Sequence, residues 1–215
     1  APYSDKTKRY YQQMNRFSAN LALLSDLAMA TLGGNLKRKE RISARLGDML
    51  SMLYLTSSVL KRYNDDGRPA QDLPLVQWAC EDNMYKAQVA LDEMLDNFPN
   101  RIVGSVLGKL LFPWGRTLRK PSDQLDHQVS RIMQTPCEAR SRLATHVYLT
   151  LEPNNQIGLI EKALTDILAA EPIFDKVVHA ANKRLPFFRL HEVAALGLEL
   201  GVITEAGAEK LRVAE

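Results

Sequence analysis

The stretch YYQQMNRFSANLALLSDLAMATLGG (Tyr10–Gly34) decides the fold class, because its apolar residues recur every three to four positions. That spacing places them on one face of an α-helix. The apolar positions are Tyr10, Met14, Phe17, Leu21, Leu24, Leu27, Ala28 and Leu32. The glycine pair that follows predicts a stop or a kink, since glycine accepts the backbone conformations that end helices.

The same spacing continues through the first half of the chain. One further apolar stripe covers residues 42–63 and another covers residues 75–95, so each predicts a long helix. Between them the sequence NDDGRPAQD (64–72) predicts a surface turn, because Gly, Pro and Asp favour turn conformations. Asp72 and Pro74 predict the start of the later helix, as an N-terminal cap and a first-turn proline.

Beyond Pro121 the helix start signals come closer together. Thr135-Pro136-Cys137-Glu138 predicts a capping box with proline at the first helical position. Further starts are predicted after Ser122, at Asn154 or Asn155, at Pro172, after Phe187-Phe188 and at Thr204. We therefore predict an all-α chain: long antiparallel helices over 1–98, then a compact set of shorter helices over 99–215, packed as one body or two.

Composition limits the classes of protein to consider. The 215 residues are 46% hydrophobic and 25% charged, as in ordinary folded proteins. A net charge of +3 is too small to predict a nucleic-acid-binding protein, and no apolar run has the ~18 residues of a membrane-spanning helix. Cys80 and Cys137 lack metal-ligand spacing and indicate thiols in a reducing compartment. The chain begins without methionine, so we expect it to belong to a longer protein.

No catalytic constellation is recognisable from the residues. Each of the four histidines falls in a different predicted segment, and none forms an HExxH motif. These histidines are His127, His146, His179 and His191. The GxSxG, GxGxxG and Walker patterns are also missing, so the sequence predicts neither a metal site nor a catalytic residue.

The segment RIVGSVLGKLLFPWGRTLRK (101–120) contains five basic residues and no acidic one. Pro99 and Pro113 limit its helix to roughly 13 residues. Either it is a buried helix, or it is an interfacial helix whose aromatic and basic residues meet anionic lipid. The candidate membrane or partner surface consists of Arg101, Val103, Leu107, Lys109, Leu110, Leu111, Phe112, Trp114 and Arg116.

Several longer stretches carry a family resemblance. LGGNLKRKERISARLGDMLSMLYLTSSVLKRY (32–63) is followed by DLPLVQWA (72–79), NFPNR (97–101), PSDQLDHQV (121–129) and NQIGLIEKAL (155–164). In this order and spacing they closely resemble the C-terminal region of the large bacterial acyl-CoA dehydrogenases of fatty-acid β-oxidation. The resemblance extends over nearly the whole chain.

The resemblance implies a parent enzyme that uses FAD to introduce a trans-2 double bond into a fatty acyl-CoA. In that family a glutamate removes the α-proton, the hydride passes to flavin N5, and an electron-transfer flavoprotein reoxidises the flavin. The base of the large form is expected in a VEGAN-type segment, which this sequence lacks. We therefore assign no catalytic residue here and do not expect FAD to be bound to this chain.

The resemblance also predicts a division of the chain. Residues 1–64 would end the helical bundle of the dehydrogenase, and residues 72–215 would form a family-specific helical extension. Very-long-chain relatives have a basic, apolar helical segment linked to membrane attachment, so by analogy residues 101–120 would bring a cytoplasmic enzyme to the inner membrane. The alternative is an autonomous helical module that binds a membrane or a partner protein. The implied partners are the rest of the dehydrogenase, fatty acyl-CoA and the electron-transfer flavoprotein, without nucleic acid.

Overall fold

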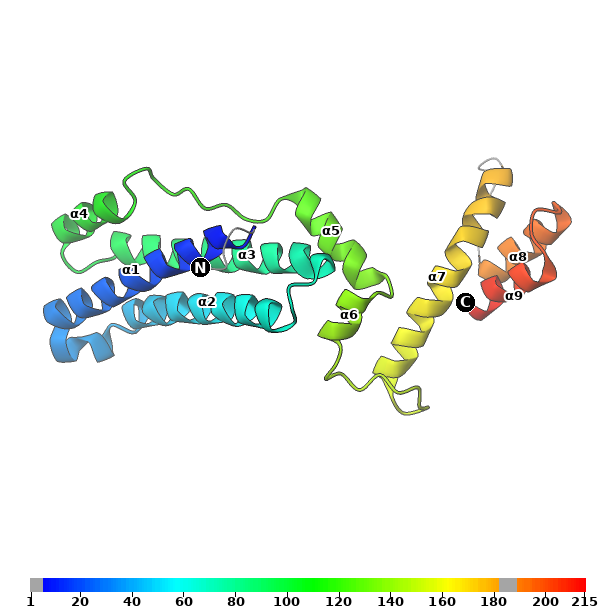
Figure 1. Ribbon diagram of the computed structural model, residues 1–215, viewed down its shortest axis with the longest axis horizontal. Helices are drawn as coiled ribbons and strands as arrows, with labels where there is room; N and C mark the ends of the chain where they lie inside the picture. Colours follow the sequence, from blue (N-terminus) through cyan, green and yellow to red (C-terminus); the bar gives the residue numbers. More distant parts are fainter. Residues whose placement is uncertain (1–5, 182–188) are drawn as a thin grey trace. The chain divides into compact units, whose positions relative to one another are not determined.

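The computed structural model describes residues 6–181 and 189–215, and within these ranges the regular structure is entirely helical. This confirms the all-α prediction (Figure 1). The chain divides into two compact units, Ala1–Ser130 and Arg131–Glu215, with the boundary inside helix α5 (Asp123–Gln134). The assignment of residues 1–64 to a parent bundle and 72–215 to an extension stays a prediction.

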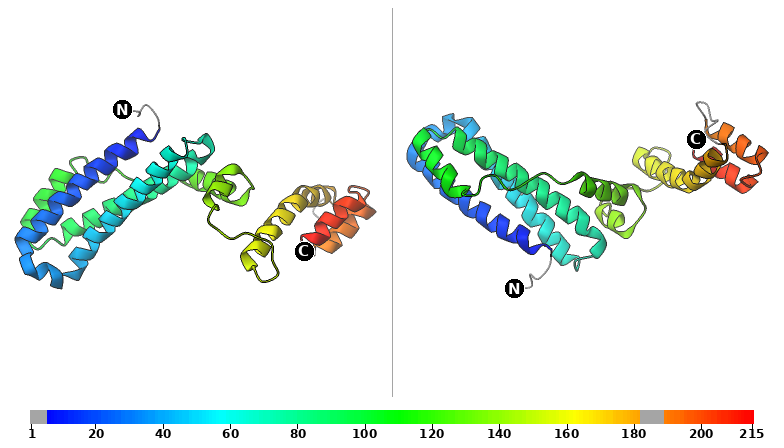
Figure 2. Two further views of the ribbon diagram at one scale, coloured as in Figure 1. Left: turned by 60° about the horizontal axis from the view of Figure 1, so that its bottom comes forward. Right: turned by 90° about the horizontal axis from the view of Figure 1, so that it is seen from above.

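Three long helices form the frame of the first unit. They are α1 (Lys8–Leu32), α2 (Glu40–Asp65) and α3 (Leu73–Asp96), and they lie side by side with alternating direction (Figures 1 and 2). Gly33 has a φ of 51°, which ends α1 as predicted, and the 3₁₀ helix η1 (Gly33–Arg38) leads into α2. A shorter 3₁₀ helix, η2 (Ala70–Asp72), precedes α3.

The apolar stripes of these helices meet in one main core. Its most buried large side chains are Phe17, Leu24, Met49, Met84, Leu91 and Met94. Burying a side chain of this size contributes about 1.5–3 kcal/mol, so the stripes that predict the helices also hold them together. A smaller cluster near the other end of the helices contains Tyr10, Leu60, Tyr63, Val76 and Cys80.

Helix α4 (Arg101–Leu111) contacts the C-terminal end of α3. The Asn100 side chain accepts hydrogen bonds from the backbone N–H groups of Ile102 and Val103, at 3.0 and 3.2 Å, and so caps the helix. Gly104 permits a close approach, because a Cβ atom there would lie 2.5 Å from the carbonyl oxygen of Leu95. The helix is 11 residues long and lies between the two prolines, as predicted.

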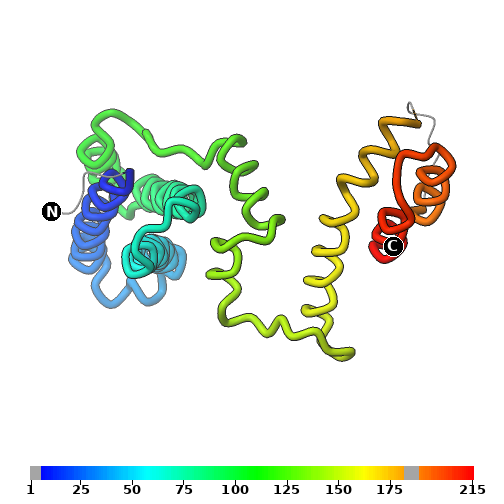
Figure 3. The backbone as a smooth tube through the Cα atoms, turned by 45° about the vertical axis from the view of Figure 1, so that its right-hand side comes forward, coloured from blue at the N-terminus to red at the C-terminus, as the bar shows by residue number. Residues whose placement is uncertain are grey.

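A segment without helix or strand, residues 113–122, leads back along α3 from α4 to α5 (Figures 1 and 3), and we call it the strap. The buried Gln88 side chain of α3 holds it through two hydrogen bonds. The amide of Gln88 donates to the carbonyl oxygen of Leu118 and accepts from the Leu118 N–H, both at 3.1 Å. The strap therefore has no regular hydrogen-bonding ladder but is fixed at its middle to a helix 30 residues earlier in the chain.

The second unit contains the end of α5 together with α6 (Glu138–Leu143), α7 (Gln156–Ala180), α8 (Leu190–Glu199) and α9 (Glu205–Val213). Its core consists of Ala170, Val177, Val193, Ala194, Ala208 and Leu211. Gly197 brings α8 against α7, since a Cβ atom there would lie 2.7 Å from a methyl group of Val177. Small residues thus set the distance between these helices.

Two predicted helix starts in the second unit were wrong. Pro172 lies inside α7 and does not begin a new helix. Its ring removes one backbone donor, but Ala170 before it and Val177 after it share one core, which favours a continuous helix. The Thr135–Glu138 capping box is not formed either, because Cys137 has an extended conformation and α6 begins only at Glu138.

Other predicted starts were confirmed. α3 begins directly after Asp72 with Pro74 in its first turn, although the Asp72 side chain does not cap the helix. Ser122 accepts a hydrogen bond from the Leu125 N–H, and Thr204 accepts one from the Gly207 N–H. Asn155 precedes α7. α8 begins at Leu190, which confirms the start predicted after Phe187-Phe188, although these two residues themselves lie outside the described ranges.

Candidate functional site

Helix α4 divides the candidate surface residues between two faces. Leu107 and Phe112 are only 7% and 5% exposed and belong to the core of the first unit. Val103 and Leu111 are half-buried and pack against the same core. These four residues are therefore core residues in this structure, and they attach α4 to α3.

The opposite face of α4 carries a different apolar line, which we call the exposed stripe. It consists of Ile102, Val106, Leu110 and Trp114, which are 77%, 60%, 65% and 86% exposed. Their spacing of four residues aligns the first three along the helix, and Trp114 follows just beyond its end. Ile102 and Val106 were not among the candidate residues. The sequence feature that could have identified them is Gly104. Because this glycine packs against α3, Ile102 and Val106 lie on a side of the helix that faces away from that contact.

The cations of residues 101–120 have unequal surroundings. Arg101 and Lys109 are exposed and form no ion pair with any described residue. Arg116 forms a salt bridge with Asp92 on α3, and its guanidinium lies 5.0 Å from the Phe112 ring centroid. The hydrogen bond to Asp92 raises the pKa of Arg116 above the ordinary value of an arginine side chain. Arg116 is thus held against the domain while Arg101 and Lys109 remain available.

Further contacts fix the strap and α5 to α3. The Lys120 ammonium lies 5.6 Å from the Tyr85 ring centroid, a cation–π distance. The Trp78 indole N–H donates to the Asp126 carboxylate over 2.6 Å. Together with the Gln88 contact, these interactions follow α3 from its C-terminal half to its N-terminal half. Two of the five cations of residues 101–120, Arg116 and Lys120, therefore interact with side chains of α3.

A pocket of about 430 Å³ lies on the small-residue side of α4, and we call it the α4 pocket. Its described lining is Leu95, Asp96, Arg101, Gly104, Ser105, Gly108, Lys109, Phe112 and Arg116. Gly108 keeps it open, because a Cβ atom there would have no neighbour within 4 Å. Three cations and one carboxylate supply its charge, so the pocket favours an anion.

The second unit has a pocket of about 400 Å³ with a mostly apolar wall. Its described lining is Gln134, Leu164, Ile167, Leu168, Ala170, Glu171, Phe174, Leu190 and Ala214. The charged group among these residues is Glu171, so an anionic ligand would meet no cation here. Its surface is suited to apolar groups.

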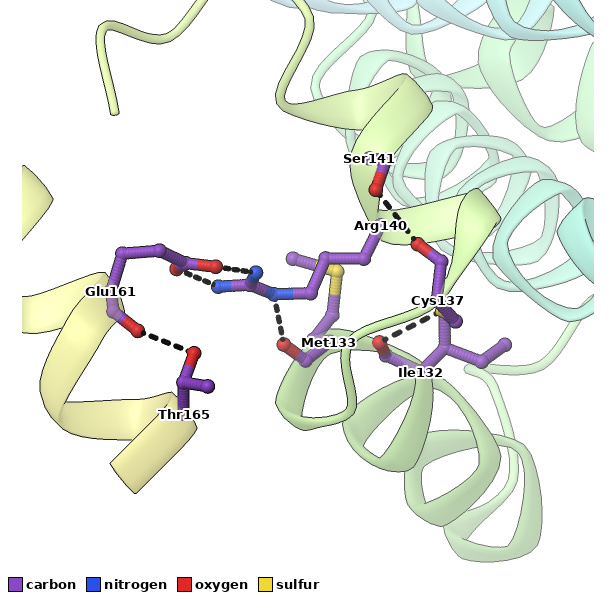
Figure 4. Close-up of polar contacts among 7 residues, drawn as sticks. All are labelled: Ile132, Met133, Cys137, Arg140, Ser141, Glu161 and Thr165. Atoms are coloured by element: carbon purple, nitrogen blue, oxygen red, sulfur yellow. Dashed lines mark hydrogen bonds and ion pairs between the residues drawn. The ribbon is translucent and has the colours of Figure 1, made fainter. Parts of the chain in front are cut away.

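Arg140 of α6 joins three segments of the second unit (Figure 4). Its guanidinium donates to both carboxylate oxygens of Glu161 on α7, and its Nε donates to the Met133 carbonyl oxygen over 2.9 Å. A paired fork of this kind is the stronger type of ion pair. The hydrogen bonds from Arg140 lower the pKa of the Glu161 carboxyl.

Among the remaining titratable groups in the described parts of the chain, Arg212 pairs with both Glu205 and Glu209 on α9. No group of three or more His, Cys, Asp or Glu residues in those described parts has metal-binding geometry. The His191 ring nitrogen Nδ1 lies 2.7 Å from the Glu215 carboxylate, which lowers the pKa of Glu215. Cys80 and Cys137 are both free thiols. Within the described ranges, no helix combines the length and the apolar character needed to cross a bilayer.

Comparison with known proteins gives one family. The model of the family described as "Acyl-CoA dehydrogenase, C-terminal, bacterial type" matches residues 1–215. No solved structure matches the chain. The match includes α4, the strap and the second unit together with the long helices, so these features lie within the matched region. The chain therefore belongs to the bacterial-type acyl-CoA dehydrogenase C-terminal family.

Proposed function

We propose that this chain is the non-catalytic C-terminal domain of an FAD-dependent acyl-CoA dehydrogenase that oxidises fatty acyl-CoA to trans-2-enoyl-CoA in β-oxidation. The family match over residues 1–215 carries this proposal. The domain has a structural and docking role, while the rest of the enzyme supplies the catalytic base and the flavin. Fatty acyl-CoA and an electron-transfer flavoprotein are then partners of the complete enzyme.

Neither of the two pockets described above fits FAD. The cofactor requires positive or N–H groups for its pyrophosphate and an apolar, stacking surface for its ring system. The α4 pocket has cations, but its aromatic residue, Phe112, is buried. The pocket of the second unit has an apolar wall but no cation. Because neither of these two pockets combines both requirements, we propose that the flavin binds in the rest of the dehydrogenase.

The outer face of α2 is the surface best suited to contact the rest of the enzyme. The sequence from Met49 to Leu60 contains no charged residue, and Leu50, Tyr54 and Leu55 are exposed on it. A helix face that meets water normally carries charged side chains. An exposed apolar face of this kind is typical of a protein–protein contact. We therefore propose that α2 packs against the remainder of the dehydrogenase.

Flavin content tests the leading proposal. We expect the complete dehydrogenase to purify with FAD and the isolated 215-residue chain to purify without it, as measured by absorbance near the flavin maximum. Stoichiometric FAD on the isolated chain would overturn the proposal. In the complete enzyme, Leu50→Glu with Tyr54→Lys is expected to reduce activity and FAD retention. Arg41→Glu, at an exposed charged position on the same helix, is the matched control.

Membrane attachment through α4 is a second candidate function, favoured by the exposed stripe. The stripe presents large apolar side chains beside Arg101 and Lys109, the combination that binds anionic lipid surfaces. Attachment would place the enzyme at the inner membrane. Leu110, Trp114 and the two free cations are the members of the original candidate surface that support this function. Ile102 and Val106 complete it.

Vesicle co-sedimentation tests membrane attachment. We expect binding to phosphatidylglycerol vesicles at low salt, weaker binding to phosphatidylcholine vesicles, and loss of binding in about 0.5 M salt. Val106→Ser with Trp114→Ala should reduce binding several-fold without changing Tm, since both residues are exposed. Leu50→Ser with Tyr54→Ala removes similar apolar area from α2 and is the control. Wild-type chain that ignores anionic vesicles at low salt would refute attachment, and binding by the isolated chain but not by the complete enzyme would favour the autonomous module.

A further inference from the structure

We propose that the α4 pocket is a binding site for a phosphate group. The ligand is a phosphate monoester or diester held by Arg101, Lys109 and Arg116 on the small-residue side of α4. This inference does not depend on membrane attachment. Both functions would use Arg101 and Lys109, but the pocket needs none of the apolar residues of the exposed stripe, and a soluble phosphate compound would occupy it equally well.

The charge distribution supports an anion. Arg101 and Lys109 have no ion-pair partner among the described residues, and the sequence contains no acidic residue between Asp96 and Asp123. Both cations line one partly enclosed space, so an anion bound there is attracted by both of them. Phosphate suits this set, because the guanidinium offers paired donors and the ammonium offers a compact charge.

Arg116 is the third cation of the pocket and is already oriented. Its salt bridge to Asp92 and its position over the Phe112 ring fix the guanidinium at the wall of the pocket. A guanidinium has five N–H donors, and the contact with Asp92 uses one of its two terminal nitrogens. A donor that is held in place before the ligand arrives loses little conformational entropy on binding. Arg116 therefore contributes donors to the ligand without being released from α3.

Small residues on α4 supply the space. Gly104 packs against Leu95, and Ser105 and Gly108 line the pocket beside it. A volume of about 430 Å³ lies within the range of small-molecule sites and exceeds what a bare phosphate needs. The Ser105 hydroxyl is a further donor on this wall. We infer that the phosphate carries an organic group.

Asp96 is the group in the lining that opposes an anion. Its carboxylate offsets part of the attraction from the three cations, so we expect weak binding, with a Kd in the millimolar range for inorganic phosphate. Replacement of this carboxylate by an amide removes the opposing charge and keeps the shape. Asp96→Asn should therefore tighten phosphate binding, whereas a purely structural role of the cations gives no reason for such a gain.

The test uses the full chain and the ¹⁵N–¹H NMR signals of Gly104 and Gly108, at constant ionic strength. Inorganic phosphate is titrated in one arm and dihexanoyl phosphatidic acid, below its micelle concentration, in the other. We expect saturable shifts at these amides with at least one probe. Arg101→Gln with Lys109→Gln should weaken binding by roughly tenfold, the loss of about 1.4 kcal/mol expected for charge-assisted hydrogen bonds.

A second variant separates a pocket from diffuse positive charge. Gly108→Met leaves every charge in place but fills the open space, and it should also weaken binding by roughly tenfold. Gly47→Met is its matched control, because Gly47 is a helical glycine on α2 that likewise has no neighbour within 4 Å of a Cβ position. Saturation by inorganic phosphate points to a soluble ligand, and saturation by the lipid alone points to a phospholipid headgroup. Unchanged binding by Gly108→Met, or no saturable shift with either probe, would overturn the proposal while leaving the dehydrogenase assignment intact.

Discussion

Gly104 and Gly108 lie one helical turn apart on α4, but they have opposite surroundings. Gly104 faces the backbone of α3, where a Cβ atom would lie 2.5 Å from the Leu95 carbonyl oxygen. Gly108 faces the open α4 pocket. The same residue type therefore serves close helix packing at one position and keeps a space empty at the other.

Alanine at each glycine should change stability in opposite directions. We expect Gly104→Ala to lower the free energy of unfolding by about 1–3 kcal/mol, because α4 must move away from α3. Gly108→Ala should raise it by about 0.5–1 kcal/mol, since alanine favours a helix over glycine and meets no neighbour. Urea unfolding of the two variants measures both effects, and equal shifts of the same sign would contradict the packing of α4 described above.

The two thiols should differ in reactivity. Cys80 is fully buried, and burial raises its pKa to about 12, so at pH 8 almost no thiolate is present. Cys137 is half-buried at the start of α6. We expect a thiol reagent to modify Cys137 in the native protein and Cys80 only after unfolding. Cys137→Ser should remove the fast phase, whereas a fast phase that survives this substitution would place Cys80 within reach of solvent.

At the scale of elements, the strap depends on one buried amide. Gln88 pairs with both the N–H and the carbonyl group of Leu118. Gln88→Leu removes the donor and the acceptor of the side-chain amide. The N–H and the carbonyl group of Leu118 then lose their hydrogen-bond partners. We expect a loss of about 1–3 kcal/mol in unfolding free energy.

Hydrogen exchange distinguishes this local effect from general destabilisation. In Gln88→Leu, exchange at residues 113–122 should become faster than exchange at α1 and α2. Gln12→Leu, at an exposed position on α1, is the control and should leave the strap protected. A uniform increase over all helices would indicate that Gln88 stabilises the core as a whole rather than the strap.

The long helices were predictable because each forms its own apolar stripe, which depends only on local spacing. The orientation of α4 was not, since Leu107 and Leu110 are equally apolar and the contact at Gly104 selects between them. The strap offers no local signal either, because Gln88 lies 30 residues before its partner. Pro172 is a strong local signal for a helix start, but core contacts on both sides of it prevail.

At the scale of the whole molecule, the two compact units carry different spectroscopic signals. Trp78 and Trp114, the two tryptophans of the sequence, both belong to the first unit. Tryptophan fluorescence therefore reports on the first unit, while far-UV circular dichroism reports on the helices of both. Comparing the two signals separates changes in the second unit from changes in the first.

The Arg140–Glu161 pair makes the stability of the second unit depend on pH. Arg140 lowers the pKa of Glu161 in the folded state below the ordinary value of 4.5. The pair therefore contributes stability above that value and loses it as the pH falls through the folded pKa. We expect Glu161→Gln to lower the circular dichroism Tm at pH 7 and to lower it progressively less as the pH falls below 4.5, with the fluorescence Tm unchanged throughout.

Glu171→Gln is the control for this pH effect, since Glu171 is an exposed carboxylate on the same helix. It should leave both melting curves unchanged at pH 7. A Tm difference between wild type and Glu161→Gln that does not shrink as the pH falls below 4.5 would contradict the ion pair as its source.

The strap also determines where the first unit can be shortened. A truncated chain that ended at Leu111, the last residue of α4, would retain α1 to α4 but lose the strap. The side of α3 that carries Tyr85 and Gln88 would then be exposed, because Lys120 and Leu118, which contact these two residues, would be missing. Its Trp78 indole would lose the Asp126 carboxylate as well. The smallest version of this unit that folds and stays soluble by itself should therefore extend at least to Asp126. For crystallisation or expression, the turn of α5 after that residue is a better end point than the apparent end of the helical bundle.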